Sequence, residues 1–117
     1  MTRVSQDLGR QGEAAAAAML EKKGMRIRER NFRTRYGEID LIASLGPILV
    51  FIEVKTRSGG SFGQPQEAVE ARKQARLRRL AAYYLARVGW SGECRFDVVA
   101  VSVRGSQTRV EHFEEAF

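Results

Sequence analysis

Three charged residues lie in an otherwise apolar part of the sequence, and their types and spacing could support hydrolysis of a phosphodiester. Asp40 lies in the run at 37–43, and Glu53 and Lys55 lie in the run at 48–55. Ile and Leu fill three of the seven positions in the first run, and Ile, Leu, Val and Phe fill six of the eight in the second. An unpaired charge is costly in such surroundings, so we expect these side chains to pair with one another or with a bound ion.

The elements that carry these charges read as two strands of a β-hairpin. Both runs have strand length, and Gly46 and Pro47 between them favour a reversal of the chain. A hairpin centred there would place Asp40 opposite Glu53, with Cβ atoms roughly 5 Å apart. Because side chains alternate along a strand, Lys55 would share a face with Glu53.

Two carboxylates at that separation repel each other unless a proton or a divalent cation lies between them. Proteins hold Mg²⁺ with one or two carboxylates, while water and substrate phosphates complete the shell. With the ammonium group of Lys55 beside it, such an ion would form a phosphodiester-cleaving arrangement. The alternative is an Asp–Lys or Glu–Lys ion pair that only stabilises the hairpin.

Length, charge and cysteine content limit the class of protein. The chain has 117 residues, which predicts one domain at 1–117, and its net charge of +6 favours a polyanionic partner such as nucleic acid or an acidic membrane surface. The one cysteine excludes an internal disulfide and fits a reducing cytosol. We find no apolar run that could span a bilayer and no signal-peptide layout, so we expect a cytoplasmic protein.

A helix is predicted before the hairpin, from about residue 4 to residue 23. Small and apolar residues recur at i, i+4, five alanines occupy 14–18, and Gly24 suits the C′ position. Glu13 has small neighbours on this helix, so it could approach the sheet. The alternative is an exposed helical glutamate.

The segment at 25–32 predicts a strand with arginine at every second position. Arg33 and Arg35 follow at the turn into the hairpin, which gives a local positive field suited to phosphate backbones. The alternative is that this row of arginines is only a solvent-exposed face of the strand. Phe32 and Tyr36 are too few to predict a set of stacking rings for bases.

A second helix is predicted from Pro65 to about Val88, after a loop at 56–64. Lys73 occupies an inward position on its apolar stripe. The side chain either extends its amine out of the packing or points across the sheet toward the carboxylates. Two further strands are predicted at 95–103 and 109–113.

The order of short motifs resembles the YraN-type family of small bacterial proteins. The motifs cover nearly the whole chain: Gly12-Glu13, Asn31-Phe32-Arg33, residues 37–43, residues 51–57, Phe62-Gly63 and Arg95-Phe96-Asp97. That family in turn is similar to the PD-(D/E)xK nuclease superfamily and, within it, to archaeal Holliday-junction resolvases. The resemblance implies an α/β fold with a restriction-endonuclease-like αβββαβ core, in which helices flank a mixed central sheet.

The resemblance also implies cleavage of DNA with Mg²⁺ or Mn²⁺. Asp40 matches the motif aspartate, although Ile39 stands where the superfamily name has proline, and residues 53–55 match the E-x-K. Glu13 matches the acidic residue that resolvase-like members carry on the first helix. In many relatives a Gln or Lys of the second core helix assists the site. Lys73 or Gln74 could be that residue, and we prefer Lys73 because it lies on the inward stripe.

We therefore expect a metal-dependent DNA endonuclease or nucleic-acid-binding protein that acts on branched DNA such as Holliday junctions. Asp40, Glu53 and Glu13 would hold the metal, and Lys55 would assist catalysis. The side chains expected to bind the substrate are Arg33, Arg35, Arg57, Lys73 and Arg76. The two-fold symmetry of a four-way junction suggests a homodimer. The alternatives are a catalytically silent nucleic-acid-binding module and an interaction protein of the envelope or division machinery.

Overall fold

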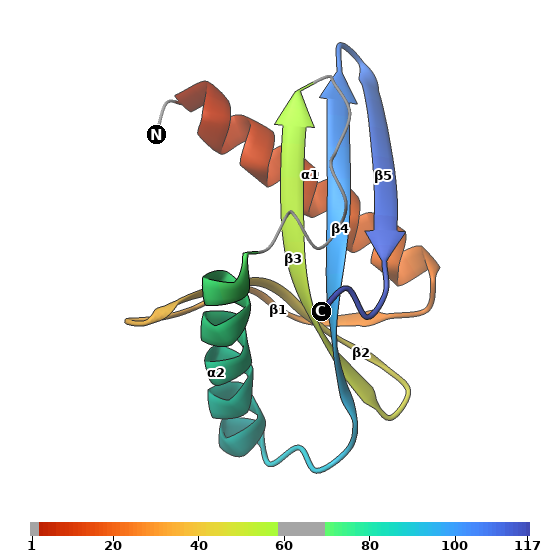
Figure 1. The fold of residues 1–117 in the computed structure, drawn as a ribbon. Helices are drawn as coiled ribbons and strands as arrows, with labels where there is room; N and C mark the ends of the chain where they lie inside the picture. Colours follow the sequence, from red (N-terminus) through yellow and green to blue (C-terminus); the bar gives the residue numbers. More distant parts are fainter. Residues whose placement is uncertain (1–2, 59–69) are drawn as a thin grey trace.

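The computed structural model describes residues 3–58 and 70–117, in which two helices pack against a five-stranded sheet (Figure 1). The elements are α1 (Arg3–Lys22), β1 (Arg26–Thr34), β2 (Gly37–Leu45), β3 (Ile48–Ser58), α2 (Ala71–Val88), β4 (Cys94–Arg104) and β5 (Gln107–Phe113). This order confirms the predicted αβββαβ core, which β5 extends by one strand. No helix of the described segments is long and apolar enough to cross a membrane.

The sheet is mixed, with the strand order β1-β2-β3-β4-β5. β3 and β4 run parallel, and the other neighbours are antiparallel. A parallel pair needs a crossover connection, and α2 lies within the one between β3 and β4. The predicted β2–β3 hairpin is confirmed, because Leu45 pairs with Ile48 across the turn at Gly46 and Pro47.

The end of α1 shows why the predicted helix stops at Gly24. Gly24 has a φ of 94°, which favours glycine, and its N–H donates to the carbonyl of Glu21 at 3.0 Å. The N–H of Met25 donates to the carbonyl of Leu20, also at 3.0 Å. These two hydrogen bonds form a Schellman motif, which satisfies carbonyls that the helix itself leaves free.

The start of α2 differs from the prediction. Pro65 lies outside the described residues, but Glu70 has extended backbone, with φ −66° and ψ 157°, so a helix through residue 70 is wrong. The carbonyl of Glu70 accepts the N–H of Gln74 at 2.8 Å, as at an N-cap position. The predicted end is confirmed, since Gly89 terminates the helix in the left-handed conformation.

The two faces of the sheet bury separate apolar clusters. On β3, Phe51 belongs to the cluster that includes residues of α2, and Val50 belongs to the cluster that includes residues of α1, as strand alternation requires. The side chains of β4 alternate in the same way, with Phe96 and Val98 on the α2 side and Val99 and Val101 on the α1 side. Glu53 therefore points to the α2 side of the sheet.

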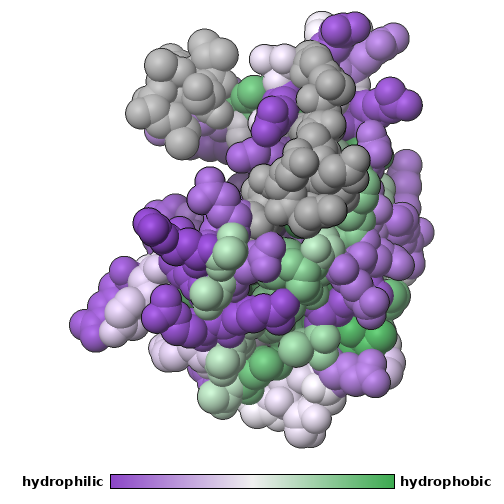
Figure 2. All heavy atoms as spheres, viewed as in Figure 1, coloured by the Kyte–Doolittle hydropathy of each residue, from purple (hydrophilic) through white to green (hydrophobic). Residues whose placement is uncertain are grey.

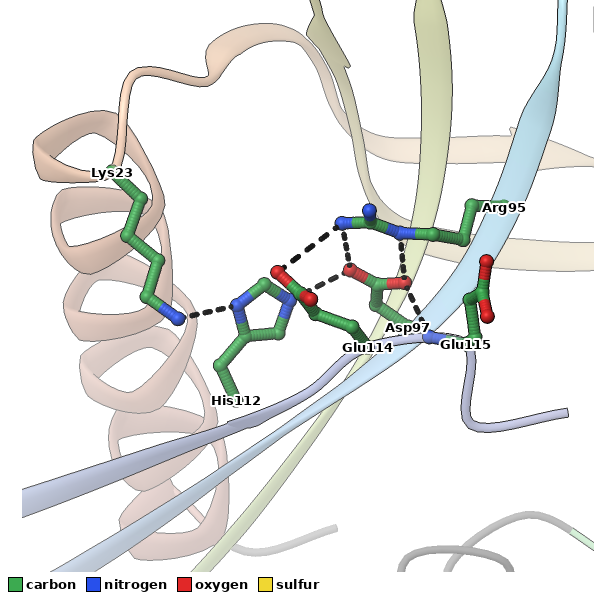
Figure 3. Close-up of polar contacts among 6 residues, drawn as sticks. All are labelled: Lys23, Arg95, Asp97, His112, Glu114 and Glu115. Carbon is green, nitrogen blue, oxygen red and sulfur yellow. Dashed lines mark hydrogen bonds and ion pairs between the residues drawn. The ribbon is translucent and has the colours of Figure 1, made fainter.

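A buried polar cluster fixes the chain after β5 (Figure 3). Asp97 is fully buried and accepts two hydrogen bonds from Arg95 at 2.9 Å, one from the Glu115 N–H at 3.1 Å, and one from His112 Nε2 at 2.7 Å. Lys23 Nζ donates to Nδ1 of His112 at 2.9 Å, which leaves Nε2 to donate. Burial alone would raise the pKa of Asp97, but these hydrogen bonds outweigh burial and lower the pKa. Asp97 is thus committed to Arg95 and its other hydrogen-bond partners within the fold.

Candidate functional site

Asp40 and Glu53, predicted to face each other, lie at the end of the β2–β3 pairing. The described pairs run from Leu45 with Ile48 to Leu41 with Ile52, so the next position brings these two acids together. Oδ2 of Asp40 accepts the backbone N–H of Val54 at 2.8 Å. The carboxylate therefore takes up a backbone donor of β3 at the point where the described strand pairing ends.

The surroundings of Asp40 oppose its ionisation. Burial raises the pKa of Asp40 to about 8, and the charge of the neighbouring Glu53 contributes to this rise. The hydrogen bond from the Val54 N–H lowers the pKa of Asp40, but its effect is smaller than that of burial. A carboxyl in this state at neutral pH holds a proton or gives it up to a cation, which is how a preformed cation site behaves before binding.

Lys73 reaches this site from α2. Its Nζ lies 2.9 Å from Oε1 of Glu53, and the Glu53 side chain is only 8% exposed. Of the two orientations considered for Lys73, the one that points toward the carboxylates is confirmed. The buried Leu77 lies one helical turn further on and holds this face of α2 against the sheet.

Asp40 and two further carboxylates form a group that was only partly predicted from the sequence. Candidate ligand atoms of Glu13, Glu38 and Asp40 all lie within 4.8 Å of one another. Burial raises the pKa of Glu13, and the charges of Glu38 and Glu53 raise it further. Such oxygen donors fit Mg²⁺ or Mn²⁺. Glu38 was missed, although its position two residues before Asp40 on a strand was a usable signal.

Asn31 orients two of these acids. With its amide nitrogen turned toward them, Asn31 donates to Oε1 of Glu38 at 2.7 Å and to Oε1 of Glu13 at 3.0 Å. Its φ of 53° lies in the left-handed region, which asparagine tolerates better than most residues. The backbone of β1 therefore adopts an uncommon conformation at the residue that contacts the acids.

Gly12 explains how Glu13 comes close to the sheet. A Cβ atom built on Gly12 would lie 2.7 Å from Cγ2 and 2.8 Å from Cβ of Thr56 on β3. Only glycine lets α1 approach β3 this closely. In the Gly12-Glu13 motif, the glycine thus allows a close helix–sheet contact, and this contact places the side chain of Glu13 near the other acids of the site.

Lys55 and Arg57 lie further along β3, on the same face as Glu53 by strand alternation. The Lys55 side chain is half-buried, and Arg57 is exposed. Neither residue lines the two hollows described next. Of the predicted catalytic and metal-binding residues, the structure brings Asp40 together with Glu13 and with Glu53.

Two hollows adjoin each other here, and acids line the smaller one. The smaller, about 330 Å³, is lined by Glu38, Asp40, Glu53, Lys73, Arg76 and Leu77. The larger, about 840 Å³, is lined by Arg33, Thr34, Arg35, Tyr36, Arg76, Arg79, Leu80, Tyr83 and Arg87. Arg76 lines both, so they are neighbours. Figure 2 shows hydrophilic residues over the projecting β1–β2 turn and the adjoining part of α2.

The predicted substrate-binding residues divide between these places. Arg33 and Arg35 line the larger hollow, Arg76 lines both, and Lys73 lines the smaller one. Arg33 also forms an ion pair with Glu38 at 3.1 Å. Tyr83, which lies on the same wall as Arg79 and Arg87, was not among the predicted site residues.

Comparison with known proteins places the chain among similar sequences. Residues 12–101 match the family described as "Uncharacterised protein family UPF0102". A UPF0102 protein of Moorella thermoacetica is 59% identical over 102 residues, which cover 86% of this chain and 85% of that protein. One of Pelotomaculum thermopropionicum is 53% identical over 113 residues, 94% of each chain. The chain therefore belongs to the UPF0102 family, which confirms the resemblance to YraN-type proteins.

Proposed function

We propose that this protein is a metal-dependent DNA endonuclease of the PD-(D/E)xK type that acts on branched DNA. The observation that supports the proposal most is the gathering of Asp40, Glu53, Glu13 and Glu38 beside a surface lined by arginines. Acids that raise one another's pKa are costly to keep together, and such groups cluster at functional sites. A purely structural pair would not need the third and fourth carboxylates.

The donor set fits a hard divalent cation. We propose that Asp40 and Glu53, with Glu13 and Glu38, hold Mg²⁺ or Mn²⁺. The bound ion would activate water and stabilise negative charge on the phosphate. The chain's own part is to orient these acids, through the Val54 N–H on Asp40 and the Asn31 amide on the two glutamates.

The basic side chains have separate proposed roles. Lys55 would donate to phosphate oxygens and stabilise developing charge. Lys73 neutralises Glu53, with which it pairs at 2.9 Å. Arg33, Arg35 and Arg76, together with Arg57, would contact the backbone of the DNA without reading its bases, so affinity should fall steeply with salt.

A second candidate is a nucleic-acid-binding module of the same fold that lacks catalysis. One observation favours it, namely that Lys73 already occupies an oxygen of Glu53. A lysine that permanently satisfies this acid would make a metal unnecessary. The two candidates therefore differ in whether a divalent cation binds at Asp40.

Calorimetric titration with Mn²⁺ and Mg²⁺ separates the candidates. Binding by the wild type that is lost in Asp40→Ala and kept in Asp7→Ala supports the nuclease, because Asp7 is an exposed acid of α1. Binding by none of the three supports the module without catalysis.

Cleavage is then tested with Mn²⁺ on a synthetic four-way junction, a flap, a linear duplex and single-stranded DNA. Cutting of the junction or flap in preference to the duplex supports the proposed substrate. Cutting of none of them at several metal concentrations would refute it. We also propose a homodimer, which light scattering in the presence of a junction would detect, because two symmetric cuts need two sites.

A further inference from the structure

The larger hollow carries groups that the cleavage site does not require. It lies between the β1–β2 turn and α2, where the turn projects beside the helix (Figure 1). It adjoins the acids through Arg76, which lines both hollows. We call this hollow, with the nine lining residues given above, the arginine groove.

The arginine groove has an unbalanced positive charge. Five of its nine lining residues are arginines, and none of the nine is acidic. Arg33 pairs with Glu38 just outside it, at 3.1 Å. Of the ion pairs within the described parts of the chain, none involves Arg76, Arg79 or Arg87. A partner with several negative charges is therefore electrostatically complementary to this groove.

Two aromatic rings stand among these arginines. Tyr36 is 66% exposed and Tyr83 is 55% exposed, and both are among the most exposed large apolar side chains of the described residues. The guanidinium of Arg35 already lies over the Tyr36 ring, 4.9 Å from its centroid. This contact shows that a face of the ring accepts a flat group.

The backbone shapes the groove so that turn and helix meet at its floor. Gly37, at the start of β2, has a φ of 146°, and a Cβ there would lie 3.2 Å from Cδ of Arg76 and 3.3 Å from Cδ1 of Leu80. A residue with a side chain would push the β1–β2 turn away from α2. Glycine keeps the wall that carries Tyr36 close to the wall that carries Tyr83.

We propose that the arginine groove binds an unpaired strand of DNA, with arginines on its phosphates and Tyr36 and Tyr83 stacked on its bases. Positively charged grooves with exposed aromatic rings bind single strands in this way, because every base presents a flat face. In a duplex those faces are covered by neighbouring base pairs, so the two rings would gain little. The inference rests on the proposed function and specifies its substrate as DNA with an unpaired strand next to the cleavage site.

Binding of labelled oligonucleotides, followed by fluorescence anisotropy in EDTA, tests this without any cleavage. We expect the wild type to bind a single strand more tightly than a duplex of the same length. Tyr36→Ala and Tyr83→Ala should each weaken single-strand binding by about 5- to 150-fold, the range of one lost base stack, and leave duplex binding within about threefold. Tyr83→Phe keeps the ring and should restore binding, which also guards against a folding defect in the alanine variant.

Charge is tested with a matched pair of variants. Arg79→Ala combined with Arg87→Ala should weaken single-strand binding and make it less salt-dependent. The logarithm of the binding constant falls with the logarithm of the salt concentration with a slope of about −0.7 per phosphate contact, so the loss of two contacts should make this slope shallower by about 1.4. Arg104→Ala combined with Arg109→Ala removes the same charge from the β4–β5 hairpin and should have a much smaller effect.

Three results would overturn the inference. They are equal losses for single strand and duplex in the tyrosine variants, no loss in those variants, and equal losses in the two arginine pairs. Because the binding assay contains no metal, its result does not depend on cleavage. Single-strand binding in the groove, together with no cutting of any substrate in the separate Mn²⁺ assay, would contradict the proposed nuclease and leave the inference standing. Cleavage of junctions that is unaffected by Tyr36→Ala and Tyr83→Ala would support the proposed nuclease and contradict the inference.

Discussion

Replacement of Asp40 by asparagine should make the metal-free protein more stable. The amide keeps the size of the side chain and an oxygen that can accept the Val54 N–H, which the carboxylate accepts at 2.8 Å. It removes the charge that burial and Glu53 oppose. Wild type and Asp40→Asn should therefore differ chiefly in the cost of ionising Asp40.

The sign and size of this effect follow from the pKa of Asp40, which burial raises from 3.8 to about 8. Because the folded state holds the proton of Asp40 more tightly than the unfolded state, the protonated carboxyl contributes to the free energy of unfolding. This contribution is fully present below about pH 4. It is lost at about 1.4 kcal/mol per pH unit as pH rises toward 8. At pH 7 the loss reaches at most about 4 kcal/mol, and water in the adjoining hollow reduces it.

Urea unfolding followed by circular dichroism between pH 4 and pH 9 in EDTA measures this difference. We expect Asp40→Asn to match the wild type within about 0.5 kcal/mol at pH 4 and to exceed it by about 2–4 kcal/mol at pH 8. Asp7→Asn is the matched control, because Asp7 is exposed on α1. If Asp40→Asn is no more stable than the wild type at pH 8, Asp40 ionises without cost and the reasoning is wrong.

The same variant connects stability to the proposed metal. A cation that displaces the proton of Asp40 should bind more tightly as pH rises toward 8, by up to about tenfold per pH unit. Mn²⁺ should therefore raise the midpoint of thermal unfolding of the wild type more at pH 8 than at pH 5. It should leave Asp40→Asn nearly unchanged. An equal shift in both proteins would place the ion elsewhere.

Three further substitutions test other parts of the structure. Gly12→Ala should destabilise the protein by about 1–3 kcal/mol in urea unfolding, because its Cβ would overlap Thr56, and adding Thr56→Ala should recover part of this loss. Asp97→Asn should destabilise it by about 3–5 kcal/mol at pH 7 and by less as pH falls through the lowered pKa of Asp97, because the buried cluster loses its anion. Lys73→Met should strengthen Mn²⁺ binding measured by calorimetry, because the cation that competes for Glu53 is gone; unchanged or weaker binding would mean that Lys73 supports the site.

The neighbourhood of Asp40 and Glu53 could be predicted because it depends on local rules alone. The turn at Gly46 and Pro47 fixes the register of the hairpin, and alternation then fixes which side chains share a face. Alternation also predicts that Glu38, two residues before Asp40, shares a face with it. Its role depends on Asn31, whose left-handed backbone and amide orientation no sequence pattern indicates.

The arginine groove could not be predicted in this way. Helical periodicity separates the buried Tyr84 from the exposed Tyr83, but it does not say what Tyr83 faces. Tyr36 and Tyr83 are 47 positions apart in the sequence, and they come together because the β1–β2 turn packs against α2 at Gly37. The start of α2 was misjudged for a related reason, because the extended backbone at Glu70 has no marker in the sequence as clear as a proline.

The two proposed sites have opposite charge and share a wall, which has a consequence for how they act together. A strand held by the arginines reaches, at Arg76, the hollow lined by Asp40 and Glu53. Phosphate and carboxylates repel each other there unless a cation lies between them. A divalent ion should therefore tighten the binding of DNA that enters the smaller hollow, and DNA must tighten the binding of the ion by the same factor. Clustered acids beside a basic groove are thus expected of a site that takes metal and phosphate together, which neither the net charge of +6 nor the acids alone would indicate.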